Sequence, residues 1–136
     1  MKGAFTLAVQ ATLRDTDALG HVNNAVYVNW LEEVRTSYVY TRRGLRTMAE
    51  VDFILASITI HFRSPVYLLE TIEMCCAPVR IGRTSWELAY EGRAREGGRL
   101  VVEAVSTQVQ YDYAARTKTP IPEGWRELLT ADMVQR

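Results

Sequence analysis

The feature that most constrains the fold is a single change of hydrophobic period near residue 24. From Asn24 onward, apolar side chains recur at the three- and four-residue steps of an amphipathic helix; they are Tyr27, Trp30, Leu31, Val34 and Tyr38. Asn23 or Asn24 suits the N-cap of this helix, and Arg42-Arg43-Gly44 supplies basic residues and a glycine for its end. The pattern predicts one helix of about 20 residues, longer than the average of ~11–12, and no second helix of that length.

The rest of the chain alternates with a period of two, which is typical of half-buried strands. Such stretches cover residues 5–13, 54–63, 70–80, 84–91 and 100–113, and a short helical tail follows Pro120 and Pro122. Short turns join most of these strands, and short turns require antiparallel pairing. The sequence therefore predicts a single α+β domain over residues 1–136, with one helix on a five-stranded antiparallel sheet. Because such a sheet has open edges, we expect at least a homodimer.

The composition and charge of the chain argue against two classes of partner, nucleic acids and membranes. The 136 residues are 48% hydrophobic and 24% charged, and 16 Lys and Arg balance 16 Asp and Glu. A nucleic-acid binder normally shows a basic excess, and no apolar run approaches the ~20 residues needed to span a bilayer. We therefore expect neither nucleic acid nor a membrane as partner. Cys75 and Cys76 are neighbours whose thiols diverge on a strand, so we expect no disulfide and a cytoplasmic protein.

Five polar residues gather immediately before and at the predicted helix start: Asp15, Asp17, His21, Asn23 and Asn24. A helix start carries unpaired N–H groups and a partial positive charge, which stabilise an oxyanion. A carboxylate and an imidazole nearby supply a nucleophile or a general base, so the loop favours acyl transfer or hydrolysis without a serine or cysteine nucleophile. Two alternatives stay open on this evidence alone. The Asx residues also suit caps and turns, and Asp15, Asp17 and His21 offer three ligands to a metal.

The segment Asp15-Thr16-Asp17-Ala18-Leu19-Gly20-His21-Val22-Asn23-Asn24-Ala25-Val26-Tyr27 resembles the signature of hotdog-fold acyl-CoA thioesterases of the 4-hydroxybenzoyl-CoA thioesterase-like family. It is also similar to a stretch of plant acyl-ACP thioesterases, which usually have a polar residue where this chain has Leu19. The resemblance implies a hotdog fold, in which a five-stranded antiparallel sheet wraps around one long central helix. It further implies an acyl-CoA substrate, no cofactor, and a homodimer or homotetramer with active sites shared between subunits.

The resemblance also assigns three catalytic roles. Asp17 takes the position of the family's catalytic carboxylate, which acts as general base on water or as nucleophile on the thioester. The backbone N–H of Asn24 takes the position that polarises the thioester carbonyl, and His21 matches a histidine that places or activates water. This chemistry uses a carboxylate and backbone dipoles, so we expect no metal.

Three further residues are candidates for substrate binding. Asn23 lies beside the helix start, where it also suits a cap. Tyr27 suits packing of the helix on the sheet and, as the alternative, the border of an acyl pocket. The resemblance places Ser85 toward the pantetheine arm of coenzyme A. His61, in contrast, alternates onto the strand face opposite Ile60, which predicts a place outside the site.

Hydrolysis of acyl-CoA thioesters is the leading hypothesis, and three alternatives compete with it. An acyl-ACP thioesterase uses the same chemistry on a protein-bound acyl group. A non-catalytic acyl-CoA sensor resembles hotdog-fold transcriptional regulators, which need a DNA-binding segment, whereas the first predicted strand here begins at Phe5. A hydratase or dehydratase on the same fold places its histidine and carboxylate differently from this loop.

Overall fold

The computed structural model describes residues 1–134 and contains the long helix that the sequence predicts. Helix α1 (Asn24–Arg43) follows Asn23, whose side chain caps it by accepting a hydrogen bond from the Ala25 N–H at 2.9 Å. The helix ends at Gly44, whose left-handed backbone (φ 67°) suits a residue without Cβ. Its buried face consists of Tyr27, Trp30, Leu31, Val34, Arg35, Tyr38 and Val39. This face is the predicted apolar stripe with one charged addition, Arg35.

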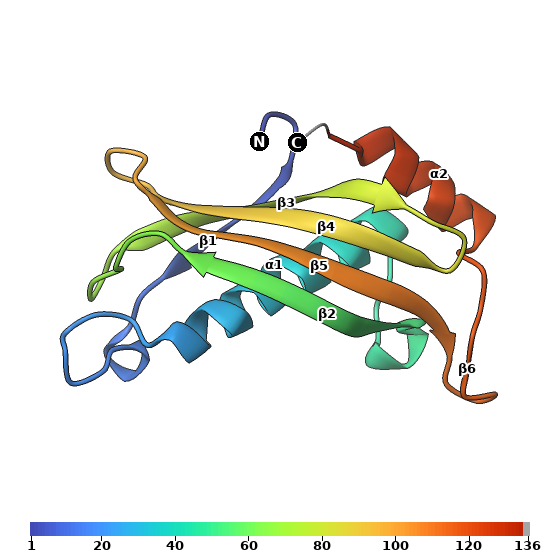
Figure 1. Cartoon of the computed structure of the whole chain (residues 1–136), viewed down its shortest axis with the longest axis horizontal. Helices are drawn as coiled ribbons and strands as arrows, with labels where there is room; N and C mark the ends of the chain where they lie inside the picture. The colour runs from blue at the N-terminus through green and yellow to red at the C-terminus, as the bar shows by residue number, and fades with distance from the viewer. Residues whose placement is uncertain (135–136) are drawn as a thin grey trace.

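The long strands form one antiparallel sheet that curls around α1 (Figure 1). They are β1 (Phe5–Gln10), β2 (Phe53–Phe62), β3 (Thr71–Ile81), β4 (Ser85–Ala94) and β5 (Leu100–Asp112), in the spatial order β1-β3-β4-β5-β2. The predicted α+β hotdog architecture is thereby confirmed. A further strand, β6 (Thr117–Lys118), pairs with the end of β5. The sequence does not predict β6, because two residues are too few to show a period.

Strand β1 ends earlier than the alternation from Phe5 to Leu13 predicts. Residues Leu13–Asp15 form a 3₁₀ turn instead, and the Leu13 side chain is 75% exposed. The Asp15 carboxylate accepts hydrogen bonds from the backbone N–H and the hydroxyl of Thr12, at 2.8 and 2.9 Å. These bonds satisfy the local backbone in place of sheet pairing. The turn then leads the chain into the loop that precedes α1.

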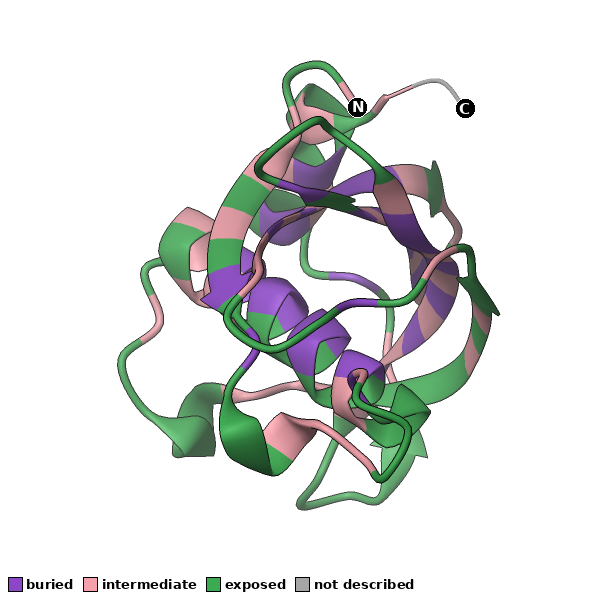
Figure 2. Cartoon of the chain, turned by 90° about the vertical axis from the view of Figure 1, so that its left-hand side faces the viewer, coloured by how far each residue is buried: buried purple, intermediate pink, exposed green. Residues whose placement is uncertain are grey.

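A second helix, α2 (Glu123–Asp132), is the predicted helical tail. Its Trp125 ring packs against Tyr38 of α1 and Trp86 of β4, with ring centroids 5.9 and 5.3 Å apart. Arg42 of α1 forms an ion pair with Asp132 at 2.6 Å. Figure 2 shows the buried side of α1 enclosed by the curled sheet. The core thus lies between the sheet and α1, and α2 covers it beside the end of α1.

Gly92 marks the closest approach within this core. A Cβ at this position would lie 2.7 Å from both the Met74 sulfur and Val102 Cγ1. We expect Gly92→Ala to lower the free energy of unfolding by about 1–3 kcal/mol, the usual cost of overpacking, as measured by urea denaturation. Gly124→Ala is the control: a Cβ there meets no atom within 4 Å, and alanine favours the helix. Equal stability of the two variants would contradict this packing.

Candidate active site

The loop before α1 is folded tightly around Asp17. Backbone hydrogen bonds run from the Asp17 N–H to the His21 carbonyl at 3.0 Å and from the Gly20 N–H to the Asp17 carbonyl at 3.1 Å. Gly20 has φ +85°, which favours glycine at the tip of the loop. The Asp17 carboxylate accepts a hydrogen bond from the Leu19 N–H at 2.8 Å through Oδ1. The carboxylate is therefore held in place by its own loop.

Asp17 and His21 form a pair at this loop. Asp17 Oδ2 lies 3.9 Å from His21 Nδ1, and the side chains are 30% and 34% exposed. Both groups are thus close enough to act together and open enough to reach water. An imidazole beside a carboxylate is suited to accept or relay a proton at neutral pH.

The start of α1 leaves the Asn24 N–H without a hydrogen-bond partner among the described residues. The Ala25 N–H bonds to the Asn23 side chain, and the Val26 N–H bonds to the Asn23 carbonyl at 2.9 Å. The Asn24 N–H donates to no residue within 1–134. A helix start with an open N–H carries partial positive charge toward whatever binds there. It is suited to polarise a carbonyl oxygen.

A cavity of about 240 Å³ lies at this helix start. Its lining residues are His21, Val22, Asn24, Tyr27, Phe62, Arg63, Ser64 and Pro65. The structure thus brings together three predicted site residues: His21, Asn24 and Tyr27. Asp17 is not part of the lining and reaches the cavity through His21.

Tyr27 forms an apolar wall of the cavity. Its side chain is 2% exposed, and its ring packs edge-on against Phe62 at a centroid distance of 5.2 Å. Burial raises the pKa of Tyr27, so its hydroxyl stays neutral at physiological pH. Tyr27 thus lies in the wall of this cavity, and its contact with a substrate stays a prediction.

One wall of the cavity comes from the end of β2 and the turn after it, and the local sequence around the loop before α1 does not predict it. Phe62 and Pro65 belong to a segment about 40 residues beyond the loop, and the Val22 N–H joins that segment by bonding to the Val66 carbonyl at 2.8 Å. No nearby motif predicts this pairing. Only the curl of the sheet around α1 brings the two segments together.

Ser85 lies far from this cavity within the same chain. It begins β4 and pairs with Val109, whereas the cavity lies near Phe62, which pairs with Val102 at the other end of β5. The Ser85 hydroxyl accepts a hydrogen bond from Arg80 at 3.2 Å. The structure therefore does not bring Ser85 to the other predicted site residues.

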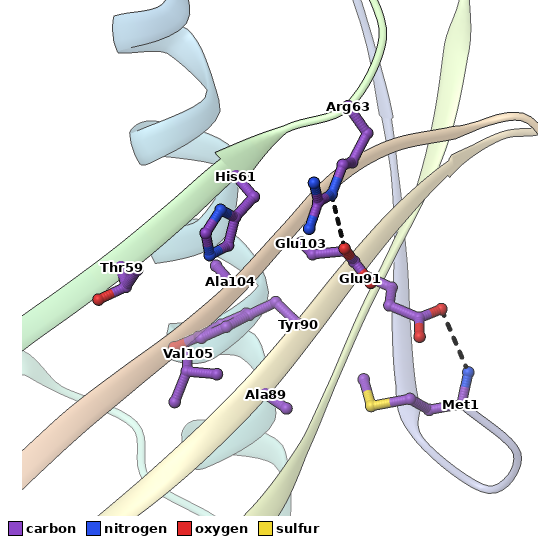
Figure 3. A pocket seen from close by; sticks show the side chains of 10 residues that line it. All are labelled: Met1, Thr59, His61, Arg63, Ala89, Tyr90, Glu91, Glu103, Ala104 and Val105. Carbon is purple, nitrogen blue, oxygen red and sulfur yellow. Dashed lines mark hydrogen bonds and ion pairs between the residues drawn. The ribbon is translucent and has the colours of Figure 1, made fainter. Parts of the chain in front are cut away.

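His61 lies on the sheet face away from the core, in a wider hollow of about 590 Å³ (Figure 3). Its neighbours Ile58 and Ile60 pack against the core, as the alternation predicts. The carboxylates in this hollow are already paired: Glu103 accepts from Arg63 at 2.8 Å, and Glu91 lies 3.6 Å from the Met1 amino group. This hollow, although larger, shows no free charged group beside an open backbone donor among the residues that the structure describes.

Within residues 1–134, no three His, Cys, Asp or Glu side chains are close enough to hold a metal ion. The absence of a metal from the chemistry remains a prediction. We expect hydrolysis of acyl-CoA, followed through the released thiol, to survive treatment with a chelator and dialysis. Loss of activity that a divalent metal restores would contradict the role of Asp17. In the same part of the chain, no helix is long and apolar enough to cross a membrane.

The curled sheet around α1 and the polar loop at its start define a hotdog-fold protein of the thioesterase type. The model of the thioesterase-like superfamily matches residues 11–129, and the chain belongs to that superfamily. A search of curated protein sequences gave no match.

Solved structures agree with this fold. A predicted thioesterase from Bacillus stearothermophilus is 20% identical, with 98% of each chain covered and a TM-score of 0.91. A thioesterase from Thermus thermophilus, complexed with coenzyme A and Zn, is 27% identical, with 96% of each chain covered and a TM-score of 0.85. A 1,4-dihydroxy-2-naphthoyl-CoA thioesterase from Synechocystis is 22% identical, covers 93% of this chain and 96% of its own, and has a TM-score of 0.83. Family and neighbours together support thioester hydrolysis.

Proposed function

We propose that this protein hydrolyses acyl-CoA thioesters to a free acid and coenzyme A. The observation that carries the proposal is the open N–H of Asn24 at the start of α1, because Asn24 lines the same cavity as His21, the partner of Asp17. The solved thioesterase from Thermus thermophilus, which is complexed with coenzyme A, supports the choice of CoA as the thiol.

Each group has a defined part in the proposed reaction. The thioester oxygen accepts a hydrogen bond from the Asn24 N–H, and the partial positive charge of the helix start stabilises the oxyanion that forms. Asp17 either removes a proton from the water that attacks the thioester, or attacks the thioester itself to form an acyl–Asp17 anhydride that water then hydrolyses to the free acid. Both routes need an ionised carboxylate. His21, which lies between Asp17 and the cavity, places the water. The sulfur of coenzyme A leaves as a thiolate when the carbonyl re-forms, and it becomes the thiol by taking up a proton, which in the general-base route is the one that Asp17 removed from water.

Thiol release from a panel of acyl-CoAs, followed with a thiol-reactive dye, tests this function. We expect turnover on at least one chain type. Binding of acyl-CoA without thiol release would instead support the acyl-CoA sensor. Release from acyl carrier protein but from no acyl-CoA would support the acyl-ACP thioesterase.

We also propose that the active form is at least a dimer, in which strand β2 pairs with a second copy. β2 is one of the two edge strands of the sheet, and its side chains Ile54, Leu55 and Phe62 are 36%, 41% and 45% exposed. Unpaired edges with exposed apolar residues are templates for pairing. Two-fold pairing of β2 would place the beginning of the partner's strand near the cavity at the end of this one.

The expected mass in solution is therefore at least twice 15.5 kDa at micromolar concentration. Light scattering provides the measurement. A mass of 15.5 kDa at that concentration would show that the edge of β2 stays unpaired and would rule out the dimer.

A further inference from the structure

Arg35 is a buried charge for which the hydrolytic site has no use. It lies on the core side of α1 and is only 6% exposed. Within residues 1–134, its guanidinium makes one hydrogen bond, from Nη1 to the Tyr90 hydroxyl at 3.2 Å. The nearest carboxylate is that of Glu32, 4.0 Å away and 69% exposed. A buried guanidinium has five N–H donors and is costly without an anion beside it.

Apart from the exposed Glu32 carboxylate, which lies 4.0 Å from Arg35 Nη2, the groups around Arg35 are polar but neutral. The Tyr90 hydroxyl lies 2.5 Å from Ser106 Oγ, and Ser106 in turn bonds to the Gln108 side chain. Burial raises the pKa of Tyr90, so its hydroxyl does not become the counter-ion. The network therefore fixes the guanidinium in position without neutralising its charge.

Arg35 lies on the same face of α1 as the open N–H of the candidate site. Asn24 and Arg35 are eleven residues apart, which is close to a whole number of turns and places them about 16 Å apart along the axis. The side chain of a helical residue leans back toward the N-terminus, which shortens the distance to the guanidinium. Two apolar residues lie between them on this face: Val28, which is 42% exposed, and Leu31, which is fully buried.

Strand β2 offers an apolar surface over the same span. Phe62 borders the cavity beside Tyr27, and Ile60 and Ile58 follow on the same side of the strand, both half-buried against the core. Ile58 pairs directly with Ser106, a member of the Arg35 network. Along α1 and β2, starting from the residues that line the cavity, the order is thus an open N–H, then apolar side chains, then a buried cation.

We propose that Arg35 selects the acyl group by binding a carboxylate at its far end, so that the preferred substrates are CoA monothioesters of dicarboxylic acids. This inference rests on the proposed thioesterase function. The thioester carbonyl binds at the Asn24 N–H, the methylene chain follows Val28 and the inner side of β2, and the distal carboxylate pairs with the guanidinium. Pairing with a carboxylate supplies the charge-assisted hydrogen bonds that the neutral network cannot.

The test compares matched pairs of substrates that differ only at the far end: adipyl- with hexanoyl-CoA, suberyl- with octanoyl-CoA, and sebacyl- with decanoyl-CoA. The wild type is expected to have a higher kcat/KM for the dicarboxylic member of at least one pair. Arg35→Met removes the charge and keeps much of the length, and Tyr90 retains its bond to Ser106. This variant should lose about 10- to 100-fold of that preference, the range for a hydrogen bond to a charged group, whereas Arg35→Lys should retain part of it.

Arg42→Met is the matched control, because Arg42 belongs to the same helix and already pairs with Asp132. It should leave the preference unchanged, and light scattering should show the same mass for all variants. Equal rates within every pair, or an unchanged preference in Arg35→Met, would overturn the inference and leave the proposed function standing. A change of mass confined to Arg35→Met would overturn it in favour of a contact between subunits.

Failure of the proposed function gives a different result, namely no thiol release from any member of the panel. The inference is then decided by calorimetric binding of suberyl-CoA and octanoyl-CoA. Tighter binding of suberyl-CoA to the wild type but not to Arg35→Met supports it, and equal binding overturns it.

Discussion

Asp17→Asn is expected to lower kcat/KM for acyl-CoA by about 10²–10⁴-fold, the usual effect of removing a general base. The neutral amide can neither take a proton from water nor attack the thioester. The fold should survive, because the amide oxygen can still accept the hydrogen bond that Leu19 N–H gives to Asp17 Oδ1. The measurement is kcat/KM on the best acyl-CoA, with thermal melts alongside.

Asp15→Asn is the matched control for this change. Asp15 lies two residues away, but its carboxylate closes the turn at Thr12 and does not line the cavity. Both hydrogen bonds go to the same oxygen, Oδ2, which an amide oxygen can replace, so activity should fall far less than in Asp17→Asn. Near-wild-type turnover of Asp17→Asn, or greater damage from Asp15→Asn, would show that Asp17 is not the catalytic carboxylate.

The long helix and the order of strands follow from the sequence because their side-chain periods are long and unbroken. α1 has five apolar residues at helical spacing, a capping asparagine before its start and a glycine after its end. Its observed bounds agree with this pattern. The end of β1 is less predictable, because alternation continues to Leu13 although the Asp15 side chain has already closed a turn. Periodicity indicates which side chains face inward. It does not indicate that the Asp15 side chain competes with sheet pairing for the backbone N–H of Thr12.

The candidate site also has a part that the sequence predicts and a part that it does not. The loop from Asp17 to Asn24 is contiguous, so its motif predicts which groups meet at the helix start. Phe62 reaches the cavity only through the curl of the sheet, and the buried position of Arg35 depends on Tyr90 and Ser106 from two distant strands. From the sequence alone, a charged residue beside an apolar stripe is predicted to face solvent. The strand residues that bury Arg35 lie far from it in the sequence, so no local pattern indicates its burial.

Asn24→Pro is expected to remove catalysis while leaving the helix intact. Proline lacks the N–H that is proposed to stabilise the oxyanion, and loss of one such donor costs about 10²–10³-fold in kcat. Proline is favoured at the first position of a helix, and Asn23 already has the extended backbone that a residue before proline needs, with φ −63° and ψ 138°. In the fold the Asn24 N–H donates to no described residue, so its removal breaks no hydrogen bond of residues 1–134.

Asn24→Ala is the control, because it removes the side chain and keeps the backbone N–H. Circular dichroism and thermal melts should show both variants folded, with melting temperatures close to that of the wild type. If Asn24→Pro is folded, any loss of its activity relative to Asn24→Ala is due to the missing backbone N–H.

The ratio of kcat for Asn24→Ala to that for Asn24→Pro, measured by thiol release from the same acyl-CoA, tests directly whether the start of α1 stabilises the reacting carbonyl. A ratio of about 10² or more is expected from the loss of one oxyanion donor. A ratio near one, with both proteins folded, would contradict an active site at the start of this helix.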